Sequence, residues 1–96
     1  MAATDLSEHT RVSACRGLLA EQLLDETVIL DPSTDAYARL NRAGTFLWPS
    51  IAEGRRLDEL AQALAARFAL SPEQARADVE AFVRMLLERG FVQAEG

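Results

Sequence analysis

Few residues in this chain are of the types that catalyse reactions. The sequence has one histidine, His9, and one cysteine, Cys15. A metal site needs several Cys, His or acidic ligands at suitable spacing, and a reactive thiol needs a neighbour that lowers its pKa. Cys15 has no Cys or His at metal-binding spacing. We interpret His9 as a solvated surface residue and Cys15 as a small apolar residue, and we expect no metal and no cofactor.

Closely spaced acidic residues occur at three places, which are Asp25/Glu26, Asp58/Glu59 and Asp78/Glu80. Paired carboxylates can act as general acid and base. These pairs, however, fall on expected turns and helix surfaces with arginines nearby, so a solvated surface is the simpler interpretation. Gly44, in LNRAGTF, is a single glycine and does not make a phosphate-binding loop. We therefore expect a protein that is not an enzyme.

Length and composition indicate one small domain. The chain has 96 residues, 49% of them apolar, and a formal net charge of −5. We expect residues 1–9 to be a flexible N-terminus and residues 10–96 to form a single domain. No apolar run is long enough for a membrane span, no signal peptide is recognisable, and one cysteine fits a reducing compartment. We therefore expect a cytoplasmic protein that does not bind a membrane. We also expect no binding to nucleic acid, because that needs a basic face and this chain is acidic.

The elements that must position a binding site centre on one junction. Residues Ala36–Leu40 (AYARL) predict a short strand that runs directly into Asn41. Asn41 is a strong helix N-cap, whose side-chain oxygen can accept from the N–H of Ala43 or Gly44. The strand is thereby joined to a helix without a loop.

Upstream residues predict the rest of a small antiparallel sheet. Thr27–Leu30 is rich in β-branched residues and ends at the turn cluster 31–35, so it pairs with Ala36–Leu40 as a hairpin. Leu18–Leu24 has helical propensity but lies beside a hairpin that needs a third strand, and we favour a strand there.

The first helix follows Asn41 and is expected to bury Phe46 and Leu47. Pro49 removes a backbone N–H and disfavours helical geometry at the residue before it. The helix is therefore expected either to end near Trp48 or to kink there, with Gly54 marking the turn.

Two further helices follow. Leu57–Phe68 carries an apolar stripe at helical spacing but a poor cap, Arg56. The third helix begins at the N-cap Ser71 and stops at Gly90, with a core stripe of Val79, Phe82, Val83 and Leu86. Phe91 and Val92 are expected to fold back onto the core. The predicted fold is α+β and winged-helix-like: an N-terminal antiparallel sheet of two or three strands followed by three helices.

The strand Ala36–Leu40 would be the last of its sheet, and an uncovered strand edge is a template for an extended peptide. By alternation, Leu40 faces the core while Tyr37 and Arg39 point the other way. A second stripe on the third helix would face the strand edge; it consists of Ala75, Asp78, Phe82 and Met85. We predict a groove with Phe82 and Met85 in its middle and Asp78 and Arg39 at its lip.

Several segments resemble the PqqD-like family of peptide chaperones, also called RiPP recognition elements. The matching segments are VILDPSTDAYARLN (28–41), AGTFLW (43–48), LDELAQALAARF (57–68) and ADVEAFVRMLLERGFV (77–92). The LN junction and the D-V-x-x-F-[VL]-x-x-L pattern of 78–86 are moderately specific, because their spacing and order both fit. The chain looks closest to the standalone leader-peptide-binding proteins of lasso-peptide clusters.

The resemblance implies a mechanism. Such domains bind the leader of a ribosomal precursor peptide as an extra antiparallel strand and present it to modifying enzymes. In lasso systems these enzymes are a cysteine leader peptidase and an ATP-dependent macrocyclase. Carried over by position, the expected peptide-binding residues are Tyr37, Ala38, Arg39, Leu40, Ala75, Asp78, Phe82 and Met85.

Alternative functions remain at this point: a winged-helix DNA-binding regulator, a peptide chaperone for a quinone cofactor, or a structural subunit of a larger enzyme. A regulator would need a basic third helix. That helix instead mixes acidic and basic residues, which are Asp78, Glu80, Glu88, Arg76, Arg84 and Arg89, and the chain has no lysine.

Overall fold

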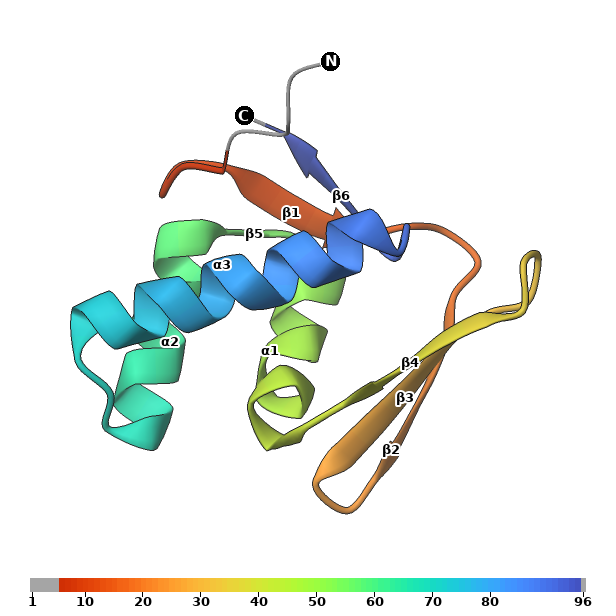
Figure 1. Ribbon diagram of the computed structural model, residues 1–96, viewed down its shortest axis with the longest axis horizontal. Coiled ribbons are helices and arrows are strands. Elements are labelled where there is room, and N and C mark those ends of the chain that lie inside the picture. The colour runs from red at the N-terminus through yellow and green to blue at the C-terminus, as the bar shows by residue number, and fades with distance from the viewer. Residues whose placement is uncertain (1–5, 96) are drawn as a thin grey trace.

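A computed structural model describes residues 6–95 of the chain. In chain order its elements are β1 (Arg11–Ala14), β2 (Leu19–Leu23), β3 (Glu26–Asp31), β4 (Ala36–Leu40), α1 (Arg42–Glu53), β5 (Arg55–Arg56), α2 (Leu57–Phe68), α3 (Pro72–Glu88) and β6 (Val92–Glu95). The sheet of β1, β5 and β6 lies above the helices in this view and the sheet of β2, β3 and β4 at the lower right, and α3 crosses in front of α1 and α2 (Figure 1). The predicted α+β class is confirmed. The likeness to a winged helix stays a prediction.

The first sheet is the predicted one, with strand order β2-β3-β4 and antiparallel pairing throughout. Residues 19–23 form a strand, as favoured above, because they gain a full ladder with β3. The turn between β3 and β4 is closed by Asp31, whose carboxylate accepts from the N–H and the hydroxyl of Ser33 at 3.0 and 2.7 Å. These hydrogen bonds stabilise the charged form and lower the pKa of Asp31.

The sequence did not predict the second sheet, which has the order β5-β1-β6. Its strands come from three distant parts of the chain, and β5 has only two residues. Such short segments carry too little alternation to be recognised before their partners are known. Phe91 and Val92, which lead into β6, are fully or almost fully buried, so the predicted return of this segment to the core is confirmed.

Helix α1 agrees with the prediction at its start but not at its end. Its start is confirmed, because the Asn41 side chain accepts from the N–H of Gly44 at 2.9 Å. Of the two outcomes predicted at Trp48, an end of the helix is wrong, because the helix continues through Pro49 to Glu53, and a kink there stays a prediction. An interior proline costs about 3 kcal/mol, and the burial of Leu47, Trp48 and Ile51 on both sides of it outweighs that cost.

Helices α2 and α3 match the predicted elements. The side chain of Arg56 does not cap α2. Its backbone N–H instead donates to the carboxylate of Glu59 at 3.0 Å. Ser71 caps α3 by accepting from the N–H of Gln74 at 3.1 Å, and Pro72 follows at the first helical position. These local signals set where α3 starts and thus which of its faces turns inward.

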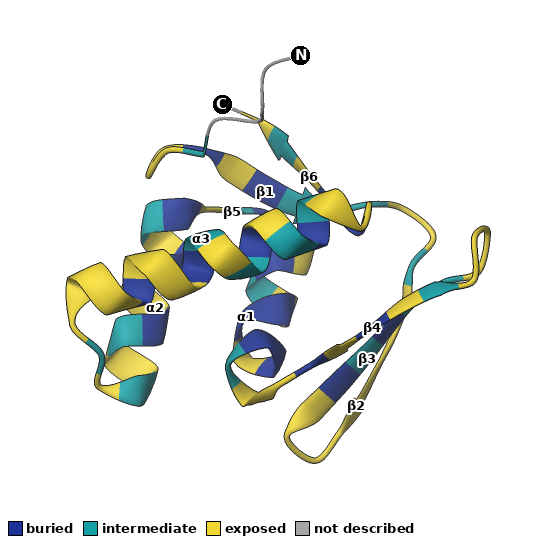
Figure 2. Cartoon of the chain, in the orientation of Figure 1, coloured by how far each residue is buried: buried dark blue, intermediate teal, exposed yellow. Residues whose placement is uncertain are grey.

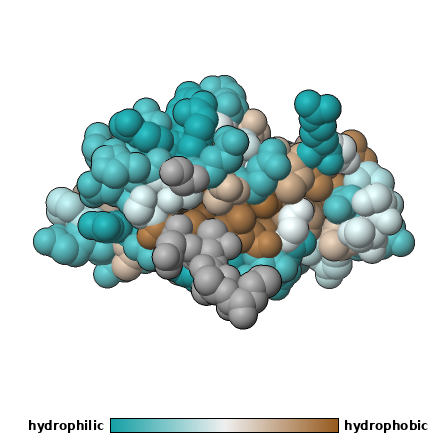
Figure 3. All heavy atoms as spheres, turned by 90° about the horizontal axis from the view of Figure 1, so that it is seen from above, coloured by the Kyte–Doolittle hydropathy of each residue, from teal (hydrophilic) through white to brown (hydrophobic). Residues whose placement is uncertain are grey.

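The core lies where the helices meet both sheets (Figure 2). Val79, Val83 and Leu86 of α3 are buried as predicted. The predicted burial of Phe46 is wrong, since 37% of it is exposed. Residues 46–48 span 200° of a helix, so one core-facing stripe cannot hold all three. Seen from above, hydrophobic residues gather in the middle of the molecule between hydrophilic ends (Figure 3).

The N-terminal segment leads into β1 along the start of α2. The carbonyl oxygens of Glu8 and Thr10 accept from the N–H groups of Asp58 and Leu57, at 3.0 and 2.9 Å. The predicted flexibility of residues 1–9 stays a prediction, and residues 1–5 lie outside the described residues. Among the helices described, none has the length and hydropathy needed to cross a bilayer.

Candidate functional site

Strand β4 is an edge strand whose two faces differ sharply. It pairs with β3 on one side and has no other strand partner among residues 6–95. Ala38 and Leu40 are buried on the core face, while Tyr37 and Arg39 are exposed on the opposite face. The predicted alternation is therefore confirmed. The unpaired edge offers backbone N–H and C=O groups to an additional strand.

A pocket of about 300 Å³ lies at the end of β4, between the first turn of α1 and the facing side of α3. It is lined by Asn41, Ala43, Gly44, Leu47, Leu64, Asp78, Ala81 and Phe82. The strand–helix junction thus forms one wall and α3 the other. Two of the four α3 residues predicted for a groove, Asp78 and Phe82, are brought together here.

Gly44 and Phe82 make the closest approach between the two walls. A Cβ atom at Gly44 would lie 2.9 Å from Cε1 and 3.0 Å from Cζ of the Phe82 ring. Carbon atoms prefer a separation of about 3.5–4.0 Å, so only glycine fits with the ring in this position. Gly44 therefore serves to let the ring of Phe82 pack against α1 and form part of the pocket.

Asp78 supplies the charge of this pocket. One of its carboxylate oxygens accepts from Nε2 of Gln74, one turn earlier on α3, at 2.7 Å. This hydrogen bond orients an exposed carboxylate beside the pocket. Met85 is half-buried and Ala75 is fully buried in the core, and neither lines the pocket.

Arg39 does not form the predicted lip opposite Asp78. Its guanidinium donates to the carboxylate of Glu26 on β3 at 2.8 Å, on the face of the sheet that points away from the core. The hydrogen bond and the charge of Glu26 raise the pKa of Arg39. Alternation along β4 places Arg39 on the face away from the core, where Glu26 is the available partner.

The same face of the sheet is largely apolar. Leu19, Leu23 and Tyr37 are 58%, 59% and 61% exposed. The register places them on one face with Val28 and Leu30, and these five residues define what we call the outer face. Sequence reasoning missed it, because Leu19, Glu21 and Leu23 share this face of the strand and the polar Glu21 between the two leucines hides its apolar character.

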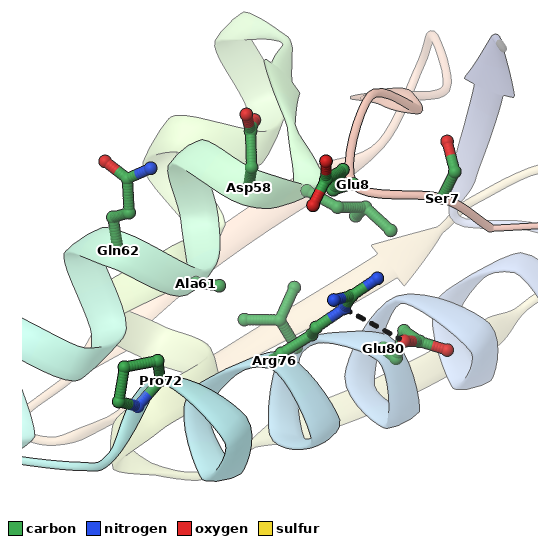
Figure 4. Close-up of a pocket in the computed structure, with 10 residues that line it drawn as sticks. Ser7, Glu8, Asp58, Ala61, Gln62, Pro72, Arg76 and Glu80 are labelled. Atoms are coloured by element: carbon green, nitrogen blue, oxygen red, sulfur yellow. Dashed lines mark ion pairs between the residues drawn. The ribbon is translucent and has the colours of Figure 1, made fainter.

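A second pocket, of about 160 Å³, lies between the N-terminal segment, α2 and α3 (Figure 4). Glu8, Asp58 and Glu80 line it together with Arg76, which forms an ion pair with Glu80 at 4.0 Å. It shares no lining residue with the pocket at the end of β4. Across residues 6–95, no three His, Cys, Asp or Glu side chains are grouped so that they could hold a metal ion.

Comparison with protein families gives a match over most of the chain. The model of the family described as coenzyme PQQ synthesis protein D (PqqD) matches residues 26–92, which include β3, β4, all three helices and the pocket between them. A comparison with curated protein sequences found no match.

Two solved structures are similar in fold. TbiB1 in complex with the TbiA(beta) leader peptide has a TM-score of 0.79 and 23% identity, covering 88% of this chain and 98% of that one. Lasso peptide synthetase B1 complexed with the leader peptide has a TM-score of 0.76 and 22% identity, covering 85% and 96%. The likeness extends over nearly the whole length of both chains.

Proposed function

Because this chain belongs to the PqqD family, we propose that it is a non-catalytic protein that binds the leader of a ribosomal precursor peptide and delivers it to modifying enzymes of the lasso-peptide type. Both structurally similar proteins were solved with a leader peptide. Such a protein would work in the cytoplasm, where precursor peptides are made.

The observation that carries the proposal is an unpaired edge of β4 beside a pocket walled by α1 and α3. A peptide that adds antiparallel to β4 gains main-chain hydrogen bonds, which contribute affinity for any sequence. Side chains on one side of that peptide would enter the pocket, which supplies selectivity. The other edge strand of the sheet, β2, is exposed along its whole length and lines no part of this pocket.

Asp78 and Phe82 would select the peptide side chains. The carboxylate of Asp78, held by Gln74, favours a basic or hydroxyl-bearing residue. The ring of Phe82 favours an apolar one. In this scheme Tyr37, Ala38, Arg39 and Leu40 contribute through the β4 backbone, with Met85 and Ala75 supporting the α3 wall.

The proposed partners are a cysteine leader peptidase and an ATP-dependent macrocyclase. The outer face supports the presence of a protein partner, because exposed leucines at 58% and 59% are otherwise unfavourable in water. It is also continuous with the peptide site, since a strand added to β4 extends the same sheet. We propose that the peptidase docks on the outer face, so Leu23→Ser should weaken peptidase binding and leave leader binding unchanged.

A second candidate is a peptide chaperone for a quinone cofactor, which the description of the matching family favours. It uses the same strand addition and differs in the peptide that is bound. A DNA-binding role is disfavoured, because the chain has a net charge of −5 and no lysine.

The test is a binding titration with synthetic leaders taken from short reading frames beside the gene. We expect one of them to bind, and its full precursor to keep its mass when mixed with this protein alone. The class of peptide that binds separates the lasso and quinone alternatives. Cleavage or dehydration by the pure protein would contradict the non-catalytic role, and the absence of binding by every neighbouring leader would contradict the proposal as a whole.

A further inference from the structure

An exposed cluster of aromatic and basic side chains lies at the Leu40 end of β4, on the side of α1 opposite the pocket described above. Phe46 and Phe68 pack edge to face, with ring centroids 5.9 Å apart and planes at 90°. The guanidinium carbons of Arg42 and Arg67 lie 5.8 and 5.0 Å from the centre of the Phe68 ring. We call these four residues the arginine–phenylalanine cluster.

Leu24 completes a hollow over this cluster. It sits at the tip of the β2–β3 hairpin and, together with the cluster, lines a pocket of about 190 Å³. It is 94% exposed and has a φ of 57°, in the left-handed region. Asparagine or glycine is preferred in such a turn, and left-handed geometry costs other residues about 1–2 kcal/mol. Both the exposure of the Leu24 side chain and its left-handed backbone are therefore unfavourable in the free protein.

The charges in the hollow suit an anionic ligand. Neither Arg42 nor Arg67 forms an ion pair with a carboxylate of the described residues. Asp25 also lines the hollow, which leaves two arginines against one aspartate, a local charge of +1 in a chain whose net charge is −5. Guanidinium groups that lie over an aromatic ring remain able to bind a carboxylate through their edges.

The hollow lies at the end of the sheet where the N-terminal flank of a peptide bound along β4 would leave the strand. A strand added antiparallel to β4 runs from the Leu40 end to the Ala36 end, so the peptide residues preceding it leave the sheet at Leu40. Leu40 pairs with Thr27, close to the β2–β3 turn, and α1 begins two residues later at Arg42. The hairpin tip and the first turn of α1 are at this end of the sheet (Figure 1).

We propose that this hollow is a second subsite for the bound peptide, which holds an acidic residue next to an aromatic or aliphatic one on the N-terminal side of the added strand. The inference rests on the proposed binding of a peptide at β4 and extends it. The carboxylate contacts Arg42 and Arg67, while the apolar side chain packs between Leu24 and Phe46.

The experiment is a selection from a phage-displayed library of random peptides of about 16 residues, long enough for a strand of five or so residues and its flanks. The wild type is compared with the double variant R42Q/R67Q. The control, R16Q/R89Q, removes two exposed arginines elsewhere. Peptides selected by the wild type and by the control should share a strand-forming stretch preceded by an acidic–apolar pair. The double variant should keep the stretch and lose the acidic preference.

Affinities then test the contact itself. A selected peptide should bind R42Q/R67Q about tenfold more weakly than wild type, a difference of about 1.4 kcal/mol. Replacing its acidic residue by the amide should weaken binding to wild type by the same factor and leave binding to the variant unchanged. The wild-type preference should also shrink at high salt.

The outcomes separate the two proposals. If the wild type enriches strand-forming peptides without an acidic residue, or if R42Q/R67Q keeps the acidic preference, the second subsite is wrong and binding at β4 stands. If the folded wild type enriches no peptide at all, both proposals fail.

Discussion

Replacing Gly44 by alanine probes the link between the fold and the peptide pocket. Gly44 is in α1 with helical backbone geometry, so the backbone itself accepts alanine. The new Cβ would stand 2.9 Å from the Phe82 ring and 3.1 Å from Cβ of Leu40. Leu40 is held by its strand, whereas the ring of Phe82 borders open space and can move into it.

Two free energies of opposite sign determine the stability of this variant. Alanine is favoured over glycine in a helix by about 1 kcal/mol. Overpacking costs about 1–3 kcal/mol, and we expect the lower end because the ring can move. The free energy of unfolding should therefore change by about 1 kcal/mol or less. Peptide binding should fall about tenfold, or 1.4 kcal/mol, because the displaced ring fills the pocket.

Chemical denaturation and fluorescence anisotropy with a labelled leader would measure both quantities. The matched control is Ala52→Gly, which makes the reverse exchange at an exposed position of the same helix outside the pocket and should destabilise the helix while leaving Phe82 in place. If Gly44→Ala binds the leader as tightly as wild type, the ring of Phe82 does not form part of the peptide site. A loss of several kcal/mol in stability would instead show that the ring cannot move.

Other substitutions give simpler expectations. Asn41→Ala should lower the free energy of unfolding by about 1 kcal/mol, since it removes the cap of α1; an unchanged thermal melt would contradict the capping role. Leu86→Ala should cost about 2–4 kcal/mol of stability because Leu86 is fully buried. Asp78→Ala should leave the melting temperature nearly unchanged but weaken leader binding by about 1–2 kcal/mol, and unaltered affinity would place the groove elsewhere; Met85→Ala should lower stability, because Met85 packs half-buried against the core outside the pocket lining. Asp31 has a lowered pKa when folded, so its contribution to stability is present above its ordinary value of 3.8 and is lost as the pH falls through the lower folded value; Asp31→Asn should remove this part of the acid dependence seen in urea titrations between pH 2 and 5.

Parts of this fold that rest on local chemistry could be predicted from the sequence. Asn41 and Ser71 are strong caps, and both hydrogen bonds are present. The period-two alternation of β4 gave the correct face to each of its residues. Each of these signals lies within a few residues of the structure that it determines. It can therefore be recognised in the sequence without knowledge of the tertiary contacts.

Parts that rest on distant contacts could not be predicted. Strands β5 and β6 form because each pairs with β1, which lies between them. Both are too short for their residue pattern to predict a strand. Pro49 signals an end to α1 that the packing of Trp48 and Ile51 overrides.

The candidate site was predictable in the same uneven way. Asp78 and Phe82 were placed in the groove from helical spacing, and they do line the pocket. Arg39 was predicted at the lip of the groove, but its guanidinium donates to Glu26 on the other face of the sheet. The approach of Gly44 to Phe82 joins residues 38 positions apart in sequence, which no local pattern reveals.

Amide hydrogen exchange of the protein with and without its leader peptide tests strand addition most directly. If the leader adds to β4, exchange should slow at the amides of β4 that point away from β3, and in α3 near Asp78 and Phe82, with β6 unchanged. The other free edge of the same sheet, β2, serves as the internal control. Protection of β2 in place of β4, or protection confined to α1 and α2, would contradict the binding of a peptide along β4.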